Sequence, residues 1–168
     1  MTITDPTAFD IRFDPRSRRM SGITAHKRMF FDVPFISEIA PNLWQGGCEA
    51  GLELPRFIKH LLSLYKWEGY NVVHRLRTQH IITMYDSLDQ STAQVDRWAR
   101  WVNARRRTGA VLVHCQAGLN RSSLVTARAL MAHDAENLTA DQAISTIREK
   151  RSPAALCNQA FEDYLRRL

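Results

Sequence analysis

The sequence predicts an α/β domain with a central, mainly parallel sheet of four to five strands flanked by helices. Strand-like and helix-like segments alternate through the middle of the 168 residues. In the C-terminal third, apolar residues recur at helical spacing. A chain of this length can bury the core of one domain. Alternation of this kind is typical of a parallel sheet with helices on both faces.

Four short segments predict the strands. Residues 39–47 combine a short apolar run with a glycine turn. Residues 70–73 and 80–85 are rich in β-branched and aromatic side chains, and residues 110–113 are almost entirely apolar. The last of these segments therefore predicts a strand that is buried in the sheet.

Amphipathic or uninterrupted helical patterns predict the helices, which cover residues 54–65, 90–106, 121–132, 139–147 and 161–168. Thr139 and Gln142 match a capping box, in which each side chain bonds the other residue's backbone N–H. The capping box places the start of the fourth predicted helix.

The first 34 residues are expected to form an irregular, basic N-terminal arm, and residues 35–168 the folded domain. Periodicity is absent before about Ile36, and the arm contains Arg12, Arg16, Arg18, Arg19, Lys27 and Arg28. The net charge of +6 suits anionic partners. RNA or another anionic partner bound through the arm is therefore one hypothesis for its role.

The three cysteines, Cys48, Cys115 and Cys157, are too few and odd in number for a disulfide framework, which favours a reducing compartment. The N-terminal residues lack the apolar core of a signal peptide, and no apolar run approaches the ~20 residues that span a bilayer. We expect a cytoplasmic protein without a membrane span. Its oligomeric state, and any redox role of Cys48 or Cys157, stay open.

The segment VHCQAGLNRSS, residues 113–123, follows the predicted buried strand and leads into a predicted helix. Ligands of open α/β sheets bind beyond the carboxyl ends of the strands. Gly118 and Asn120 tolerate left-handed backbone angles, so the loop can curl with its N–H groups inward and form an anion cradle with the helix N-terminus. This cradle would bind phosphate and favour the thiolate of Cys115. Arg121 supplies a planar fork for two phosphate oxygens.

Other residues of this segment have supporting roles. Ser122 offers a hydroxyl close to the sulfur and is expected to stabilise the thiolate when the phosphocysteine is hydrolysed. His114 is expected to organise the loop by hydrogen bonding. The predicted substrate-binding residues are His114, Gln116, Ala117, Gly118, Leu119, Asn120 and Arg121.

HCQAGLNRSS resembles the signature of the cysteine-based protein tyrosine phosphatases, His-Cys-x5-Arg followed by Ser or Thr, and is most similar to the dual-specificity subgroup. The resemblance covers residues 36–168 and is weak between Gly51 and His80. It implies the phosphotyrosine protein phosphatase-like fold, with residues 35–168 as the catalytic domain. It also implies hydrolysis of phosphotyrosine and phosphoserine/threonine in proteins through a cysteinyl phosphate. No cofactor or metal is expected, because the cradle and Arg121 supply the charge stabilisation.

A phosphate ester also needs its leaving oxygen protonated. The family uses an aspartate on a loop upstream of the cysteine, and MYDSLDQS, residues 84–91, offers two. Asp89 precedes a predicted helix and is a natural N-cap. Asp86 directly ends a predicted strand, so we favour it as general acid and keep Asp89 as the alternative.

Two other functions stay open. GLNR, residues 118–121, is similar to the loop of RNA 5′-triphosphatases, and Arg105–Arg107 would suit RNA. Ser122 and Ser123 stand where that branch usually has Thr-Gly, which favours the protein phosphatases. A non-catalytic phosphate- or nucleic-acid-binding module would usually lack the cysteine, the arginine or the acid. The loop between Cys115 and Arg121 carries no charged residue, which argues against inositol phosphates as substrates. We expect a shallow pocket that accepts phosphotyrosine and phosphoserine/threonine.

Overall fold

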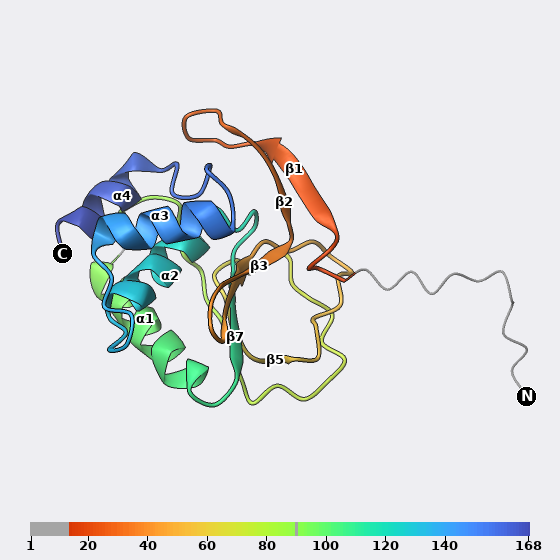
Figure 1. The fold of residues 1–168 in the computed structure, drawn as a ribbon. Coiled ribbons are helices and arrows are strands. Elements are labelled where there is room, and N and C mark those ends of the chain that lie inside the picture. The colour runs from red at the N-terminus through yellow and green to blue at the C-terminus, as the bar shows by residue number, and fades with distance from the viewer. Residues whose placement is uncertain (1–13, 90) are drawn as a thin grey trace, which may run out of the picture.

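The computed structural model describes residues 14–89 and 91–168. At its centre is a five-stranded sheet in the order β3-β4-β7-β5-β6. Figure 1 labels β3, β7 and β5 of this sheet. Its strands are β3 (Ile36–Ala40), β4 (Leu43–Gly46), β5 (Ile58–Ser63), β6 (Thr78–Ile81) and β7 (Ala110–His114). β3 and β4 pair antiparallel, and the other neighbours pair in parallel. The predicted mainly parallel sheet is confirmed.

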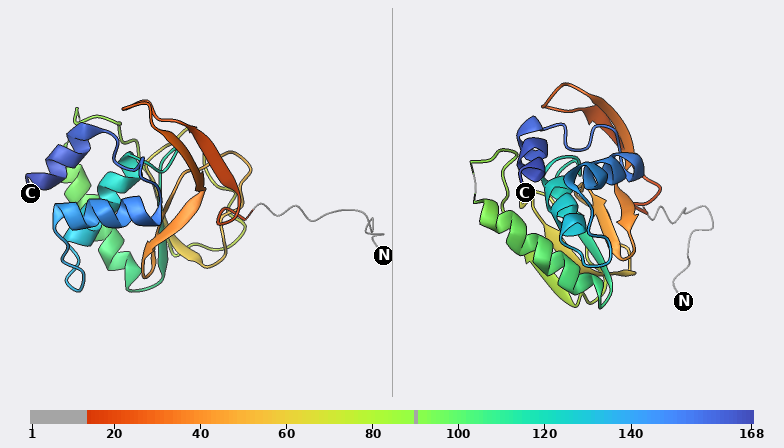
Figure 2. Two further views of the ribbon diagram at one scale, coloured as in Figure 1. Left: turned by 45° about the horizontal axis from the view of Figure 1, so that its top comes forward. Right: turned by 60° about the vertical axis from the view of Figure 1, so that its left-hand side comes forward.

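The four helices of the described residues are α1 (Thr92–Arg106), α2 (Arg121–Met131), α3 (Ala140–Lys150) and α4 (Gln159–Arg166), and they lie together on one side of the sheet (Figures 1 and 2). The prediction of helices on both faces is wrong. In the described part of the chain, irregular segments cover the second face, where Phe57, Tyr70 and Leu76 pack around Leu112 and its buried neighbours.

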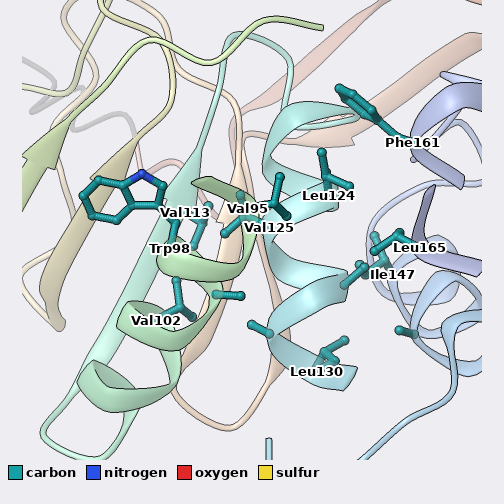
Figure 3. Close-up of a cluster of buried hydrophobic side chains, with 14 of the residues drawn as sticks. Val95, Trp98, Val102, Val113, Leu124, Val125, Leu130, Ile147, Phe161 and Leu165 are labelled. Carbon is teal, nitrogen blue, oxygen red and sulfur yellow. The ribbon is translucent and has the colours of Figure 1, made fainter. Parts of the chain in front are cut away.

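The main core lies between the sheet and the helices, and α2 passes through its middle. Figure 3 shows side chains of α2 between those of α1 and β7 on one side and those of α3 and α4 on the other. Residues 122–127 of α2 are all buried. The start of this helix, where the predicted loop ends, is therefore fixed by packing on every side.

The predicted helix over residues 54–65 is wrong, because residues 58–63 form strand β5. Five of its six residues are buried, since β5 lies between β6 and β7 with both faces covered. The apolar residues of this segment recur at helical spacing, and a strand that is buried on both faces lacks the alternation that would identify it. Residues 70–73 contribute an isolated bridge between Glu53 and Asn71, and the strand predicted at 80–85 ends at Ile81.

Other predicted elements are confirmed with small shifts at their ends. β7 matches the strand that was predicted to be buried, and α2 matches the helix that was predicted to begin at residue 121. α1 begins at Thr92, while Gln90 lies outside the described residues. None of the helices in the described ranges is both long and apolar enough to cross a bilayer.

The prediction of an irregular N-terminal arm is wrong for residues 19–34. β1 (Arg19–Ile23) and β2 (Phe30–Pro34) form an antiparallel hairpin, and residues 1–13 lie outside the described part. The hairpin forms because one of its faces buries apolar side chains against the loop after β7. The residues of this small core are Met20, Met29, Phe31, Val33, Ala117, Leu119 and Ala154.

The capping box of α3 generates a test of the fold. Thr139 Oγ1 accepts a hydrogen bond from the Gln142 N–H (3.2 Å), and Gln142 Oε1 accepts one from the Thr139 N–H (2.9 Å). Thr139→Ala should lower the free energy of unfolding by about 1 kcal/mol, because a helix N–H loses its partner. Denaturant unfolding measures the change. Ser145→Ala, at an exposed site of α3, is the control, and an equal loss in both variants would contradict the cap.

Candidate active site

The predicted phosphate loop lies at the carboxyl end of β7, the central strand of the sheet. The Cys115 N–H donates to the Gly46 carbonyl (3.1 Å), which holds the start of the loop on β4. Cys115 is buried and lines a cavity of about 370 Å³. The other loop residues that line this cavity are Gln116, Ala117, Leu119, Asn120 and Arg121.

The backbone carbonyls of residues 116–120 are all bonded to the surrounding protein. Three accept backbone N–H groups: Gln116 O from Cys48 (3.0 Å), Leu119 O from Leu156 (2.7 Å) and Asn120 O from Leu124 (2.8 Å). The peptide bonds are trans, so each N–H points opposite to the carbonyl of its own peptide unit. The N–H groups of residues 117–121 therefore point away from these hydrogen-bonded carbonyls, as the predicted anion cradle requires.

The remaining two carbonyls accept hydrogen bonds from Arg151. Its guanidinium donates to Ala117 O (3.1 Å) and Gly118 O (2.5 Å), and also to the carbonyls of Pro34 and Phe35. Arg151 is 5% exposed, and burial lowers its pKa to about 10, so it is charged at neutral pH. Within residues 14–89 and 91–168, no carboxylate pairs with it. Its charge therefore adds to the positive potential behind the loop.

Gly118 adopts the left-handed conformation that its place in the loop predicts, with φ of +68°. A Cβ at this position would overlap the Gly46 carbonyl, so a larger residue would displace the loop from β4. Gln45 supports the same contact, because its Nε2 donates to Gly118 O (3.0 Å) and to Ser123 Oγ (2.6 Å).

Cys115 and Arg121 line the same cavity, and Ser122 lies beside Cys115. Cys115 Sγ and Ser122 Oγ are 3.4 Å apart, and both residues are buried. Arg121 Nη1 donates to the Met84 carbonyl (3.3 Å), and its guanidinium lies 5.2 Å from the centre of the Tyr65 ring. These two contacts orient the guanidinium beside the cavity, as a bidentate phosphate ligand requires.

His114 lies outside the cavity, although the sequence places it beside the cysteine. Burial lowers its pKa to about 4, so the imidazole is neutral at pH 7. Its Nδ1 is 3.3 Å from Cys115 O, and its ring meets Tyr70 edge-on. The structure therefore gives His114 a contact with the loop backbone, as expected, and no place against a substrate in this cavity.

Of the two candidate acids, Asp86 lines the cavity with Cys115 and Arg121, whereas Asp89 is exposed and does not line it. Two amides hold the Asp86 carboxylate: Asn158 Nδ2 donates to Oδ1 (2.9 Å), and Asn120 Nδ2 donates to Oδ2 (3.1 Å). The geometry favours Asp86 as general acid. The N-cap residue of α1 is Ser91, so the expected capping role of Asp89 is wrong.

Two residues that position the site are not among the predicted site residues. Asn158 is the N-cap of α4, where its Oδ1 accepts the Ala160 N–H (3.1 Å), and it also holds Asp86. Its capping position was visible in the sequence, but its contact with Asp86 was not. Arg151 gave no signal, because arginines are frequent throughout this chain.

The other two cysteines lie near the loop. Cys157 Sγ is 3.3 Å from the Asn120 amide nitrogen, and the Cys48 N–H bonds the loop at Gln116 O. Burial raises the pKa of Cys48 to about 12, which keeps its thiol protonated. All three cysteines are free. Among the described residues, His, Cys, Asp and Glu side chains form no group of three that could hold a metal ion.

The sequence is similar to that of a known phosphatase. The chain is 29% identical over 138 residues to MAP kinase phosphatase with leucine-rich repeats protein 3 of Dictyostelium discoideum, covering 77% of this chain and 15% of that relative. The chain therefore spans only a small part of the relative's length.

The fold is shared by solved structures of other proteins. Human DUSP28 superposes with a TM-score of 0.69 at 24% identity, covering 80% of this chain and 92% of that one. Human tyrosine phosphatase-like serine/threonine/tyrosine-interacting protein gives 0.65 at 19% identity, covering 79% and 93%.

The family model "Dual specificity phosphatase, catalytic domain" matches residues 58–168. This range contains β5–β7, all four helices, the phosphate loop and Asp86. Because the match covers the greater part of the chain, the chain belongs to the dual specificity phosphatase catalytic domain family.

Proposed function

We propose that this chain hydrolyses phosphotyrosine and phosphoserine/threonine in proteins through a cysteinyl-phosphate intermediate. The observation that carries the proposal is the joint placement of Cys115, Arg121 and Asp86 around one cavity, beside a loop whose carbonyls are bonded to the surrounding protein. Nucleophile, anion ligands and acid are thereby all available to one phosphate. The three free cysteines suit the reducing cytoplasm, which we propose as the location.

In the first step, the Cys115 thiolate attacks phosphorus, the S–P bond forms and the P–O ester bond breaks. Arg121 and the N–H groups of the loop hold the three non-bridging oxygens, where negative charge is greatest. Asp86 gives its proton to the leaving oxygen, which departs as a neutral alcohol or phenol. The two amides on the Asp86 carboxylate fix its direction toward the cavity.

In the second step, water attacks the phosphorus of the cysteinyl phosphate. The Asp86 carboxylate removes a proton from this water, the P–S bond breaks and inorganic phosphate leaves. The departing sulfur carries the negative charge, and the Ser122 hydroxyl at 3.4 Å donates a hydrogen bond to it. The cycle returns Cys115 as a thiolate and Asp86 as an acid.

The contacts of the basic residues disfavour RNA as the substrate or partner. Arg16, Arg18 and Arg19 pair with Asp14, Glu49 and Asp32. In the run of residues 105–107, Arg106 is buried against Glu136 (2.5 Å). Four of the basic residues that suggested a nucleic-acid surface are therefore paired with carboxylates of the protein, and the matched family is one of protein phosphatases.

A non-catalytic binding module is the second rival, since human tyrosine phosphatase-like serine/threonine/tyrosine-interacting protein shares the fold. Fold alone does not distinguish an enzyme from a binding protein. The cysteine, the arginine and the aspartate are all present here in one site, which favours catalysis.

Turnover of a substrate panel tests the proposed function. The chain should release phosphate from phosphotyrosyl and phosphoseryl peptides faster than from triphosphate-ended RNA. Cys115→Ser should abolish turnover, because the hydroxyl is not ionised at neutral pH, yet still bind phosphopeptide in a calorimetric titration. Binding by the wild type without turnover, or preference for the RNA, would contradict the proposal.

The assignment of the acid is tested by comparing Asp86→Asn with Asp89→Asn. Asp86→Asn should lower kcat by roughly 10²–10⁴-fold on an alkyl phosphate, because the leaving alkoxide is no longer protonated. The loss should be smaller on p-nitrophenyl phosphate, whose leaving group departs readily as an anion. Asp89→Asn is the matched control. A larger loss in Asp89→Asn, or an Asp86→Asn effect independent of the leaving group, would refute the assignment.

A further inference from the structure

We propose that the β1–β2 hairpin selects the substrate of this site, by providing an apolar wall for the aromatic ring of an aryl phosphate. The site then prefers phosphotyrosine to phosphoserine and phosphothreonine. The inference rests on the proposed phosphatase function and goes beyond the family match, which begins at residue 58, after the hairpin.

The cavity around Cys115 has two unlike halves. The phosphate loop and Asp86 supply N–H groups, a guanidinium and a carboxylate. The hairpin supplies the other part of the lining, including the apolar side chains of Met20, Ile23 and Phe31. A phosphate bound on the loop leaves the hairpin to contact the group that carries the phosphate.

The hairpin is held in place along one strand and at its tip. Along strand β2, Phe31 and Val33 pack on Leu119 of the phosphate loop. At the tip, Lys27 Nζ donates to Gln159 Oε1 of α4 (2.8 Å), and His26 Nε2 lies 3.5 Å from Asp86 Oδ2. Figure 1 shows the hairpin reaching across the molecule toward α4. The wall is therefore built before a substrate arrives.

Ile23 is the part of this wall that a substrate would cover. It is 61% exposed although it lines the cavity, so its apolar surface is open to water in the free protein. A tyrosine ring bound beside it would remove this surface from water, which favours binding. In phosphoserine one carbon separates the phosphate oxygen from the backbone. Its peptide groups would have to enter beside the apolar wall, where lost hydrogen bonds to water cost free energy.

The test is the ratio of kcat/KM for a phosphotyrosyl peptide and a phosphoseryl peptide of the same sequence. Wild type should favour the phosphotyrosyl peptide. Ile23→Ser should lower kcat/KM for it about five-fold, the effect of losing part of one aliphatic contact, and change the phosphoseryl value less than about two-fold. Ile81→Ser is the matched control, because Ile81 is 60% exposed on β6 and does not line the cavity.

An unchanged ratio in Ile23→Ser, an equal loss on both peptides, or a wild-type preference for phosphoserine would overturn the role of the hairpin while leaving the phosphatase function intact. If the wild type hydrolyses neither peptide, the proposed function itself fails, and the inference that rests on it fails too. An equal change of the ratio in Ile81→Ser would also overturn the inference.

Discussion

The site depends on the direction of the five consecutive peptide units between Gln116 and Arg121. A backbone carbonyl turned into the cavity would repel a phosphate, and an unpaired carbonyl turned into the core would be costly. Here each of these carbonyls finds a donor in the protein, and two share the guanidinium of Arg151. Burying a cation such as the Arg151 guanidinium without a carboxylate partner is unfavourable by itself. Its hydrogen bonds to the loop and to the carbonyls before β3 offset that cost.

This arrangement also links parts of the chain that are far apart in sequence. Arg151 joins the end of α3 to the phosphate loop and to residues 34–35, where the hairpin ends and the sheet begins. Asn120 and Asn158 join the loop and α4 to Asp86. One hydrogen-bonded framework therefore holds both the nucleophile and the acid in position. A substitution in α3 or α4 is expected to change the rate of the reaction at Cys115.

Features formed by residues that are neighbours in the sequence could be predicted, whereas features that depend on distant residues could not. Cys115, Gly118 and Arg121 could be assigned because strand, loop and helix follow one another along the chain. The helix expected at residues 54–65 failed because β5 is buried on both faces, which removes the alternation that identifies a strand. The hairpin was missed because the arginines, glycine and proline of residues 14–34 suggested an irregular segment. Arg151 acts on residues more than thirty positions away, and no local pattern reports such a contact.

Oxyanion affinity in Arg151 variants measures the role of this framework most directly. Calorimetric titration with tungstate, a phosphate mimic, should show at least about ten-fold weaker binding to Arg151→Met than to the wild type, since hydrogen bonds to a charged donor contribute ~1.5–3 kcal/mol. Arg151→Lys should lie between them, because it keeps the charge and loses the fork. Thermal unfolding of each variant establishes that it is folded at the titration temperature. Wild-type affinity in a folded Arg151→Met would contradict the dependence of the cradle on Arg151.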